Sequence, residues 1–542
     1  MQKLKIQNNQ FNIGHICTKQ QCEEGRGDKV AMRWINATLE KKDYTFNDLE
    51  SESNRFANVL QKLGFGKGDI FFTFLPKAPE QFFAFLGTLK LQAIAGTLFS
   101  NFGEDSLLDR LGDSGARGII TKKSLYKKLS RIREKLPALK CIILTDIEEH
   151  LSDDVLSYQL LMSEVSEKFN VAITSPDTPS VLHYTSGSTG KPKGVQHLHR
   201  SILLQSYTSE NIMQLNENEI FWCTADQGWV TGTSYGIIGP WSLGVTQIHF
   251  GGAYDAEVWM NLLEEEQVSI WYSAPTALRM LMREEASVFQ KHHLDKLKHI
   301  FSVGEPLNPE IIHWSQQLLK KDIYDTWFQT ETGSIMISNR PGINIKPGSM
   351  AKPLDIIEAA IISDKGEILG NKLSGNLCLK AGWDSMFSMY LNNEEVYNKK
   401  FKNGYYYSGD LAYRDDEGYY WFLGRNDDVI NTAGHLISPF EIESALLELP
   451  EIAESGVIGA QDDVLFEKVV AYVRLHKNVI WNDDLEMKIR LYLSNKLSSI
   501  ATPQQIIIVD EVPKNKSGKI MRRVLKAWYE GKDPGDISTL DV

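Results

Sequence analysis

The stretch YTSGSTGKPKGV (Tyr184–Val195) directly follows an apolar run that begins at Val181, and it is rich in glycine, hydroxyl and lysine residues. Glycine lets the backbone approach a ligand closely, at a cost in folding entropy. Successive backbone N–H groups in such a turn form a concave anion site, and hydroxyl and ammonium groups add donors. A solvated surface turn needs glycine and serine but no pair of lysines. The stretch therefore predicts a loop that binds a chain of phosphates.

This loop differs from the P-loop of nucleoside triphosphatases. In that motif, four residues separate the glycine from G-K-[S/T], so that a helix N-terminus starts there and the hydroxyl meets Mg²⁺. Here Gly187 and Gly190 are too close together, and Pro192 follows Lys191. The sequence therefore predicts a mobile phosphate-binding loop of another kind.

Length and composition narrow the class of protein. A chain of 542 residues exceeds what one core usually supports, so two or more domains are expected. Hydrophobic residues make up 42% and charged residues 24%, which is ordinary for a soluble globular protein. The net charge of −12 argues against nucleic acid or an anionic membrane as the main partner. A phosphate ligand must then be attracted locally.

The cysteines favour a reducing, cytoplasmic setting. Five thiols lie scattered along the chain without a C-x-x-C pair: Cys17, Cys22, Cys141, Cys223 and Cys378. His15 lies near the first two, but no second cluster completes a zinc site. The N-terminal MQKLKIQNNQ lacks an apolar signal core, and no apolar run approaches the roughly 18 residues of a membrane span.

Apolar strands alternate with helical stretches up to about Pro306. Predicted strands that run into polar or glycine-containing turns cover 69–76, 221–226, 268–275 and 299–306, and 79–99 is expected to form a buried helix entering a strand. Such alternation predicts parallel βαβ units with both sheet faces covered. Ligands of open α/β sheets bind beyond the carboxyl ends of the strands, so we expect the site at these turns.

After about Ile343, the sequence pattern changes to short strand-like runs that are typical of antiparallel sheets. GRNDDVINTAG (Gly424–Gly434) is polar and glycine-bounded, as expected of a hinge, and a compact α+β unit follows it. We therefore predict a large domain over 1–426 and a small mobile domain over 427–542. One local match, G-x-D-S-L within Phe102–Leu111, is typical of carrier proteins that bear a phosphopantetheine arm, but its α/β context favours Ser106 as a helix-entry residue.

Five separated motifs occur in a fixed order along the chain. They are YTSGSTGKPKGV (184–195), DTWFQTETG (325–333), YYSGD (406–410), GRNDDVI (424–430) and PKNKSGKIMRR (513–523). Together they resemble the adenylate-forming superfamily of acyl-CoA synthetases, non-ribosomal adenylation domains and luciferases, from about Tyr44 to Lys526. CTADQGWVTGTSYGIIGP (223–240) and DTWFQTETG are most similar to the acetyl-CoA synthetase branch.

The resemblance implies a fold and a reaction. The fold would be a large α/β N-terminal domain, with parallel βαβ sheets and a β-rich subdomain, and a smaller mobile α+β C-terminal domain. A carboxylate would attack the α-phosphate of ATP to give acyl-AMP and pyrophosphate, and the thiol of coenzyme A would then attack the acyl carbon. Neither step requires a covalent enzyme nucleophile, so the enzyme supplies positioning and charge stabilisation. ATP, Mg²⁺ and coenzyme A are the implied ligands.

The resemblance also implies roles for individual residues around the nucleotide. The β- and γ-phosphates would be held by Thr185, Ser186, Gly187, Ser188, Thr189, Gly190 and Lys193. Other residues placed at ATP or AMP are Gly304, Glu305 and Pro306 beside the adenine, and Asp325, Thr326, Phe328 and Gln329 in the second motif. Thr330 would contact the α-phosphate, and Glu331 would bind Mg²⁺, a hard cation that prefers oxygen ligands.

The remaining implied roles belong to the last three motifs. Asp410 would accept hydrogen bonds from both ribose hydroxyls, since a carboxylate has two acceptor oxygens. Arg425 would lie on the ribose or phosphate, and Asp427 matches the position about which the small domain turns. Lys519 resembles the lysine that reaches the α-phosphate and the carboxylate during adenylation, where a point charge on a flexible stem suits a moving domain.

Two departures from the family pattern concern affinity and substrate. Leu436 stands where the family usually has arginine, so a phosphate contact is missing or supplied elsewhere. Phe328 stands where acetyl-CoA synthetases commonly have a second tryptophan, and it would close an acyl pocket formed with Trp229, Val230, Thr231 and Val303. Phenylalanine is still bulky, which favours acetate, with propionate as a competitor.

Other functions remain open from the sequence. A propionate or other short- or medium-chain acyl-CoA synthetase shares every motif. An enzyme that loads a carrier protein and a luciferase-like oxygenase share the phosphate motifs, although Trp229 and Phe328 disfavour both. A non-catalytic nucleotide-binding protein would fit Leu436 but not the retained acidic residues and Lys519.

Overall fold

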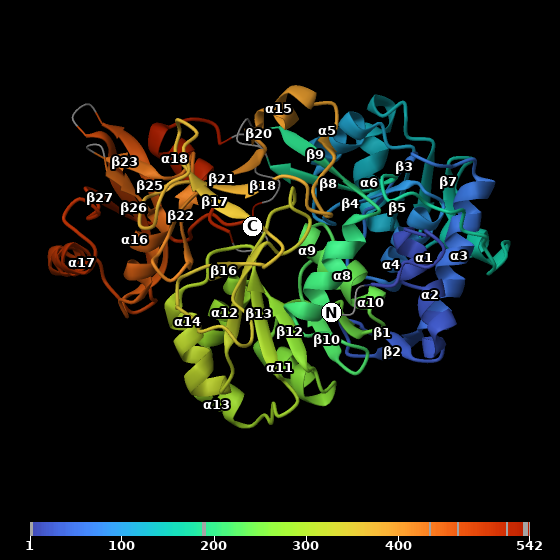
Figure 1. Ribbon diagram of the computed structural model, residues 1–542, viewed down its shortest axis with the longest axis horizontal. Helices are drawn as coiled ribbons and strands as arrows, with labels where there is room; N and C mark the ends of the chain where they lie inside the picture. The colour runs from blue at the N-terminus through green and yellow to red at the C-terminus, as the bar shows by residue number, and fades with distance from the viewer. Residues whose placement is uncertain are drawn as a thin grey trace.

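The computed structural model describes residues 4–186, 191–432, 435–462, 465–515, 519–534 and 540 (Figure 1). Its described residues form four sheets. No helix among them combines the length and apolar composition that a membrane span requires. Short helices α1 (Ile13–Ile16) and α2 (Lys19–Gln21) precede the first sheet strands.

The first sheet has eight strands in the order β19-β9-β8-β4-β3-β5-β6-β7. Its strands are β3 (Ile70–Thr73), β4 (Ile94–Thr97), β5 (Gly118–Thr121), β6 (Cys141–Leu144), β7 (Val155–Ser157), β8 (Pro179–Ser186), β9 (Pro192–Leu198) and β19 (Met389–Tyr390). The run from β8 through β4, β3, β5 and β6 to β7 is parallel, as the alternation of strands and helices predicted. Its helices are α3 (Phe46–Lys62), α4 (Pro79–Lys90), α5 (Glu104–Ser114), α6 (Lys123–Ile132) and α7 (Tyr158–Ser163). Ser106 is buried in the first turn of α5, which fits a structural role and not a carrier attachment site.

The second sheet has nine strands in the order β16-β15-β14-β13-β12-β10-β11-β1-β2. Its strands are β1 (Val30–Ile35), β2 (Lys41–Thr45), β10 (Ile220–Cys223), β11 (Thr246–Phe250), β12 (Ile270–Ser273), β13 (His299–Val303), β14 (Ile323–Trp327), β15 (Ile337–Ser338) and β16 (Lys352–Pro353). The strands from β1 to β14 in that order are parallel. Its helices are α8 (Ser201–Asn211), α9 (Val230–Thr233), α10 (Gly239–Ser242), α11 (Ala256–Glu265), α12 (Pro275–Met282), α13 (Ala286–Gln290) and α14 (Pro309–Trp314).

Two antiparallel-rich sheets follow. The third contains β17 (Ala359–Ile362), β18 (Gly375–Lys380), β20 (Phe401–Lys402), β21 (Tyr405–Arg414) and β22 (Tyr420–Arg425), with α15 (Glu394–Lys399) leading into β20. The fourth contains β23 (Ile430–Thr432), β24 (His435–Ile437), β25 (Ile452–Asp462), β26 (Phe466–Leu475) and β27 (Gln505–Ile508), with α16 (Pro439–Leu447), α17 (Asp483–Lys496) and α18 (Arg522–Glu530). The fourth sheet and its helices occupy one end of the molecule (Figure 1). The domain division at 426/427 stays a prediction.

Side chains join this end of the molecule to the second sheet's helices. Asn308, the residue before α14, donates from Nδ2 to Ser444 Oγ of α16 at 2.7 Å. The Glu310 carboxyl in α14 shares a hydrogen bond with Glu448, which follows α16. Burial raises the pKa of Glu310 to about 7, and the neighbouring Glu448 carboxylate adds to the rise.

This carboxyl pair predicts a pH-dependent stability. Because the folded pKa of Glu310 lies above its ordinary value of 4.5, the folded protein holds a proton that the unfolded chain releases. The free energy of unfolding therefore falls as the pH rises from about 4.5 to about 7 through this residue. Glu310→Gln is expected to raise the melting temperature at pH values near 8 and to change it little near 5.

The exposed Glu284 offers a matched control. Scanning fluorimetry of Glu310→Gln and Glu284→Gln across this pH range measures the difference. A Glu310→Gln curve parallel to the wild type would show that the pair does not hold the extra proton.

Candidate active site

The predicted nucleotide residues considered first lie near the ends of β8 and β14 and within β21. The phosphate loop connects β8 to β9, where Thr185 pairs with Lys193 in antiparallel register. Gln329, Thr330 and Glu331 follow the carboxyl end of β14, the last parallel strand of its sheet. Asp410 lies in β21. The first two locations agree with the rule that ligands bind at strand ends in α/β sheets.

Asp410 is the centre of a hydrogen-bonded group. It is only 3% exposed, and its Oδ2 accepts hydrogen bonds from Trp327 Nε1 and Gln329 Nε2, both at 3.0 Å. Its Oδ1 lies 3.3 Å from Arg425 Nη1. Burial raises the pKa of Asp410, whereas Arg425, the Trp327 bond and Lys519 lower it. One carboxylate oxygen is thus fixed by the protein, and the other faces a cation without a hydrogen bond.

Gln329 ties this carboxylate to the backbone of β21. Its Oε1 accepts from Tyr406 OH at 2.9 Å, and its Nε2 also approaches the carbonyl oxygen of Ser408 at 3.3 Å. Gly409 between Ser408 and Asp410 has φ of +85°, a conformation that side chains rarely adopt. The glycine of the YYSGD motif therefore permits the turn in the chain that places Asp410.

Glu331 and Lys193 share a tyrosine that the motifs did not indicate. Tyr390 OH donates to Glu331 Oε1 at 2.6 Å, and Lys193 Nζ lies 5.5 Å from the centre of the same ring. The carbonyl oxygen of Thr330 lies 2.8 Å from His197 Nε2 in β9. This contact joins the turn after β14 to the β8–β9 hairpin, which carries the phosphate loop.

Glu331 can fit a magnesium ion of the usual kind. Mg²⁺ is commonly bound by one or two carboxylates together with substrate phosphates and water. Glu331 Oε1 is engaged by Tyr390, and its second oxygen accepts no hydrogen bond from a described residue. No group of three or more His, Cys, Asp or Glu side chains among the described residues forms an all-protein metal site.

Lys519 reaches the same region from the C-terminal unit. Its backbone N–H donates to Asn515 Oδ1, and its carbonyl accepts from the Asn515 N–H, both at 2.9 Å. Desolvation lowers the pKa of the Lys519 ammonium, and nearby Arg425 lowers it further, while Asp428 and Asp410 raise it. The lysine of the last motif therefore lies within the electrostatic field of the Asp410 group.

Asp427 and its neighbours connect this region to α18. Asp427 is exposed and lies 3.9 Å from Arg425 Nε, and its carbonyl accepts from Lys526 Nζ at 3.5 Å. Arg522, three residues after Lys519, binds Glu443 through Nη2 at 2.5 Å and lies 3.8 Å from Asp428. The hinge role of Asp427 stays a prediction.

The predicted acyl-pocket residues surround α9 and the ends of two strands. Phe328 packs edge-on against the ring of Tyr235, with centroids 5.5 Å apart, and the ring of Tyr235 is fully buried. Val303 ends β13 in the same hydrophobic cluster. Val230 and Thr231 are the first residues of α9. Trp229 precedes this helix and packs against Phe99, with ring centroids 4.9 Å apart.

Three predicted nucleotide residues have side chains that are hydrogen-bonded to other protein groups or buried in a strand. The Glu305 carboxylate accepts hydrogen bonds from Thr276 Oγ1 at 2.8 Å and from Arg279 Nη2 at 2.7 Å. Arg279 Nη1 donates to Asn308 Oδ1 at 2.9 Å. The Asp325 and Thr326 side chains are buried in β14. Thr326 Oγ1 donates to the Ser302 carbonyl at 2.8 Å.

Other predicted residues lie at exposed or undescribed positions. Gly304 is exposed with φ of +96°, and Pro306 follows in the same turn. Gly187, Ser188, Thr189 and Gly190 lie outside the described residues, as do the side chains of Ser186 and Leu436.

The sequence analysis missed the aromatic partners of the acidic residues. Trp327 lies inside the DTWFQTETG motif and Tyr406 inside YYSGD, so the motifs contained both without showing their roles. Tyr390 stands in no motif. It reaches the site because β19 pairs with β9, placing Tyr390 opposite Val195.

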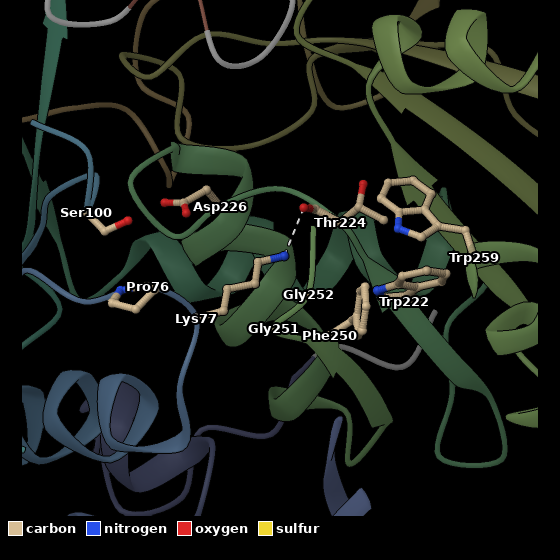
Figure 2. Close-up of a pocket in the computed structure, with 10 residues that line it drawn as sticks. All are labelled: Pro76, Lys77, Ser100, Trp222, Thr224, Asp226, Phe250, Gly251, Gly252 and Trp259. Carbon is tan, nitrogen blue, oxygen red and sulfur yellow. Dashed lines mark hydrogen bonds between the residues drawn. The ribbon is translucent and has the colours of Figure 1, made fainter. Parts of the chain in front are cut away.

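A cavity of about 260 Å³ lies beside the segment after β10 that contains Thr224 and Asp226 (Figure 2). Lys77 and Asp226 line one side, and Trp222, Phe250 and Trp259 line the other. Lys77 Nζ donates to the Thr224 carbonyl at 2.9 Å. The indole N–H groups of Trp222 and Trp259 are buried without an acceptor among the described residues. The cavity thus has charged side chains on one side and aromatic rings on the other.

Comparison with known proteins gives consistent matches along the chain. Residues 18–391 match the AMP-binding enzyme family, and residues 441–519 match the AMP-binding enzyme C-terminal domain. The chain is 44% identical to the acetyl-coenzyme A synthetase of Bacillus subtilis, covering 98% of this chain and 93% of that protein. It is 37% identical to the acetyl-coenzyme A synthetase of Rubrobacter xylanophilus, covering 98% and 86%.

Solved structures give the same picture of the fold. The anthranilate CoA ligase AuaEII in complex with anthranoyl-AMP is 28% identical with a TM-score of 0.89, covering 98% of this chain and 99% of that chain. A Brucella canis acyl-CoA synthetase is 29% identical with a TM-score of 0.76, covering 97% and 96%.

Proposed function

The chain belongs to the AMP-binding enzyme family, and from this premise we propose that it ligates acetate to coenzyme A. ATP activates the acid as acyl-AMP with release of pyrophosphate, and the thiol then displaces AMP. The protein is an AMP-forming acid–thiol ligase with the adenylate-forming enzyme fold. The observation that carries the proposal is the near full-length similarity to acetyl-coenzyme A synthetases, together with the charged groups that meet around Asp410.

The site suggests how the first step is arranged. We assign the free oxygen of Asp410 to the ribose hydroxyls, because its other oxygen is already held by Trp327 and Gln329. Lys193 would neutralise the outer phosphates, and Glu331 would hold Mg²⁺, which screens the charge of the triphosphate. Lys519 would stabilise the charge that develops between the carboxylate and the α-phosphate.

The second step requires Lys519 to leave and the thiol to enter. We propose that the C-terminal unit turns about Asp427 between the two steps. This assignment is supported by the exposure of Asp427 and by its position between β22 and β23.

We further propose that the amide-bearing arm of coenzyme A approaches through the cavity of Figure 2. Lys77 and Ser100 in the lining can donate to carbonyl acceptors, and the lining residue Asp226 precedes Trp229 by three residues. Ser100→Phe would narrow this cavity. It is expected to raise KM for coenzyme A several-fold and to leave acid-dependent pyrophosphate exchange unchanged, since the first half-reaction does not use the thiol. Equal KM values for coenzyme A in the two proteins would place the arm elsewhere.

The function is tested by AMP production with formate, acetate, propionate, butyrate and longer acids, with and without coenzyme A. Acetate and coenzyme A together are expected to give the highest kcat/KM. A preference for propionate would change the substrate but keep the reaction. Turnover that depends on a carrier protein and not on coenzyme A would overturn the proposed acceptor. We also propose a cytoplasmic location, which is supported by free cysteines at all five positions.

A further inference from the structure

Lys400 is a charged residue that no motif includes, and it lies among the groups of the candidate site. It follows α15 directly and precedes β20. Its Nζ approaches the carbonyl oxygens of Tyr407 at 3.4 Å and Ser408 at 3.3 Å, and it lies 5.6 Å from the centre of the Tyr406 ring. These contacts direct the ammonium along β21 toward Asp410.

The charges around Lys400 come from four different segments. Desolvation lowers the pKa of the ammonium, and Arg425 and Lys193 lower it further, while Glu331 and Asp410 raise it. Glu331 is the candidate magnesium ligand, and Asp410 is the candidate ribose ligand. Lys400 is therefore within electrostatic range of the candidate ligands on both sides of the expected α-phosphate.

Lys400 and Arg425 border the same open space beside Gly409. A Cβ atom placed on Gly409 would lie 3.4 Å from Arg425 Nη2 and 3.6 Å from Lys400 Nζ. Arg425 already faces the Asp410 carboxylate at 3.3 Å, whereas Lys400 Nζ has only the two carbonyl oxygens within hydrogen-bond distance among the described residues. An anion such as a phosphate oxygen would complete its partners, and the bare glycine backbone lets that anion approach. An α15 C-terminus also favours a cation at position 400, but the helix end alone would not require a second cation opposite.

We propose that Lys400 binds a non-bridging oxygen of the α-phosphate in both ATP and acyl-AMP. The α-phosphate is the group that stands between the ribose, assigned to Asp410, and the metal, assigned to Glu331. Lys400 lies between α15 and β20, beside the third sheet, and not in the C-terminal unit that carries Lys519. It therefore stays at the phosphate when Lys519 leaves, and it holds the adenylate during thioester formation. This inference rests on the proposed nucleotide site.

The inference is tested by binding of adenosine and of AMP to the full chain, measured by calorimetry. Lys400→Met keeps the length of the side chain and removes its charge. It is expected to weaken AMP binding about tenfold or more, the scale of one charge-assisted hydrogen bond. Adenosine, which has no phosphate, is expected to bind within about twofold of the wild type. Lys400→Arg should recover most of the AMP affinity.

Lys402→Met is the matched control, because Lys402 is an exposed lysine two residues later, in β20. It is expected to bind both ligands like the wild type. Unchanged AMP affinity in Lys400→Met would overturn the proposal, and so would an equal loss for adenosine and AMP, which indicates a purely structural role. Failure of the proposed function is separately visible, since the wild type would then bind AMP and yet exchange no pyrophosphate with any acid.

Discussion

Lys519→Ala is expected to lower the rate of acyl-AMP formation by at least about 10²–10³-fold while largely sparing thioester formation from supplied acyl-AMP. Lys519 is the cation that the C-terminal unit brings into the field of Asp410 and Arg425. Adenylation builds negative charge between an incoming carboxylate and the α-phosphate, and a missing ammonium leaves that charge uncompensated in a poorly solvated site. In the second half-reaction the proposed turn about Asp427 removes Lys519, so its charge is no longer used.

The two half-reactions are measured separately by acid-dependent pyrophosphate exchange and by release of AMP from acyl-AMP and coenzyme A. Lys532→Ala is the matched control, because Lys532 is an exposed lysine that follows α18. An equal loss in both half-reactions of Lys519→Ala would contradict the division of roles.

Phe328→Gly is expected to shift the acid range toward longer chains. The ring of Phe328 packs against Tyr235, whose own ring is fully buried, so its removal opens space that the interior does not refill readily. Discrimination in an apolar pocket is about 1–3 kcal/mol per methylene. If the enlarged pocket accepts two or three more methylenes of the acyl chain, the kcat/KM of hexanoate relative to acetate should rise by about 10²-fold or more.

The measurement is kcat/KM for acetate, propionate, butyrate and hexanoate. Phe328→Leu keeps an apolar side chain of intermediate size, and it is expected to show a smaller shift in the same direction. An unchanged acid profile in Phe328→Gly would remove Phe328 as the residue that limits chain length.

Local pattern predicted the fold class, whereas the roles of the motif residues stay predictions. The alternation of strands and helices correctly predicted parallel sheets. The 223–240 and 325–333 motifs lie where apolar strands end. Asp410 and Gln329 converge as the ordered motifs implied. The reason is that each motif places a polar group directly after, or within, a buried strand whose position the sheet determines.

Contacts made by distant pairing could not be predicted in the same way. Tyr390 binds Glu331 only because a two-residue strand joins the far edge of the first sheet, and no periodicity marks so short an element. Lys400 is one lysine in the run KKFK, and its burial depends on the antiparallel pairing of β20 with β21. The placement of Glu305 beside adenine stays a prediction, and the sequence did not indicate that its carboxylate accepts a hydrogen bond from Arg279.

The hydrogen bonds that run from Glu305 through Arg279 and Asn308 to Ser444 have a thermodynamic consequence. If the C-terminal unit turns away as proposed, the hydrogen bond between Asn308 and Ser444 breaks, and the chain of bonds leads from there to the turn where the base is expected. Linkage is reciprocal, so a purine that favours one setting of these side chains also biases the orientation of the tail. The proposed turn of the C-terminal unit would therefore be coupled to nucleotide binding.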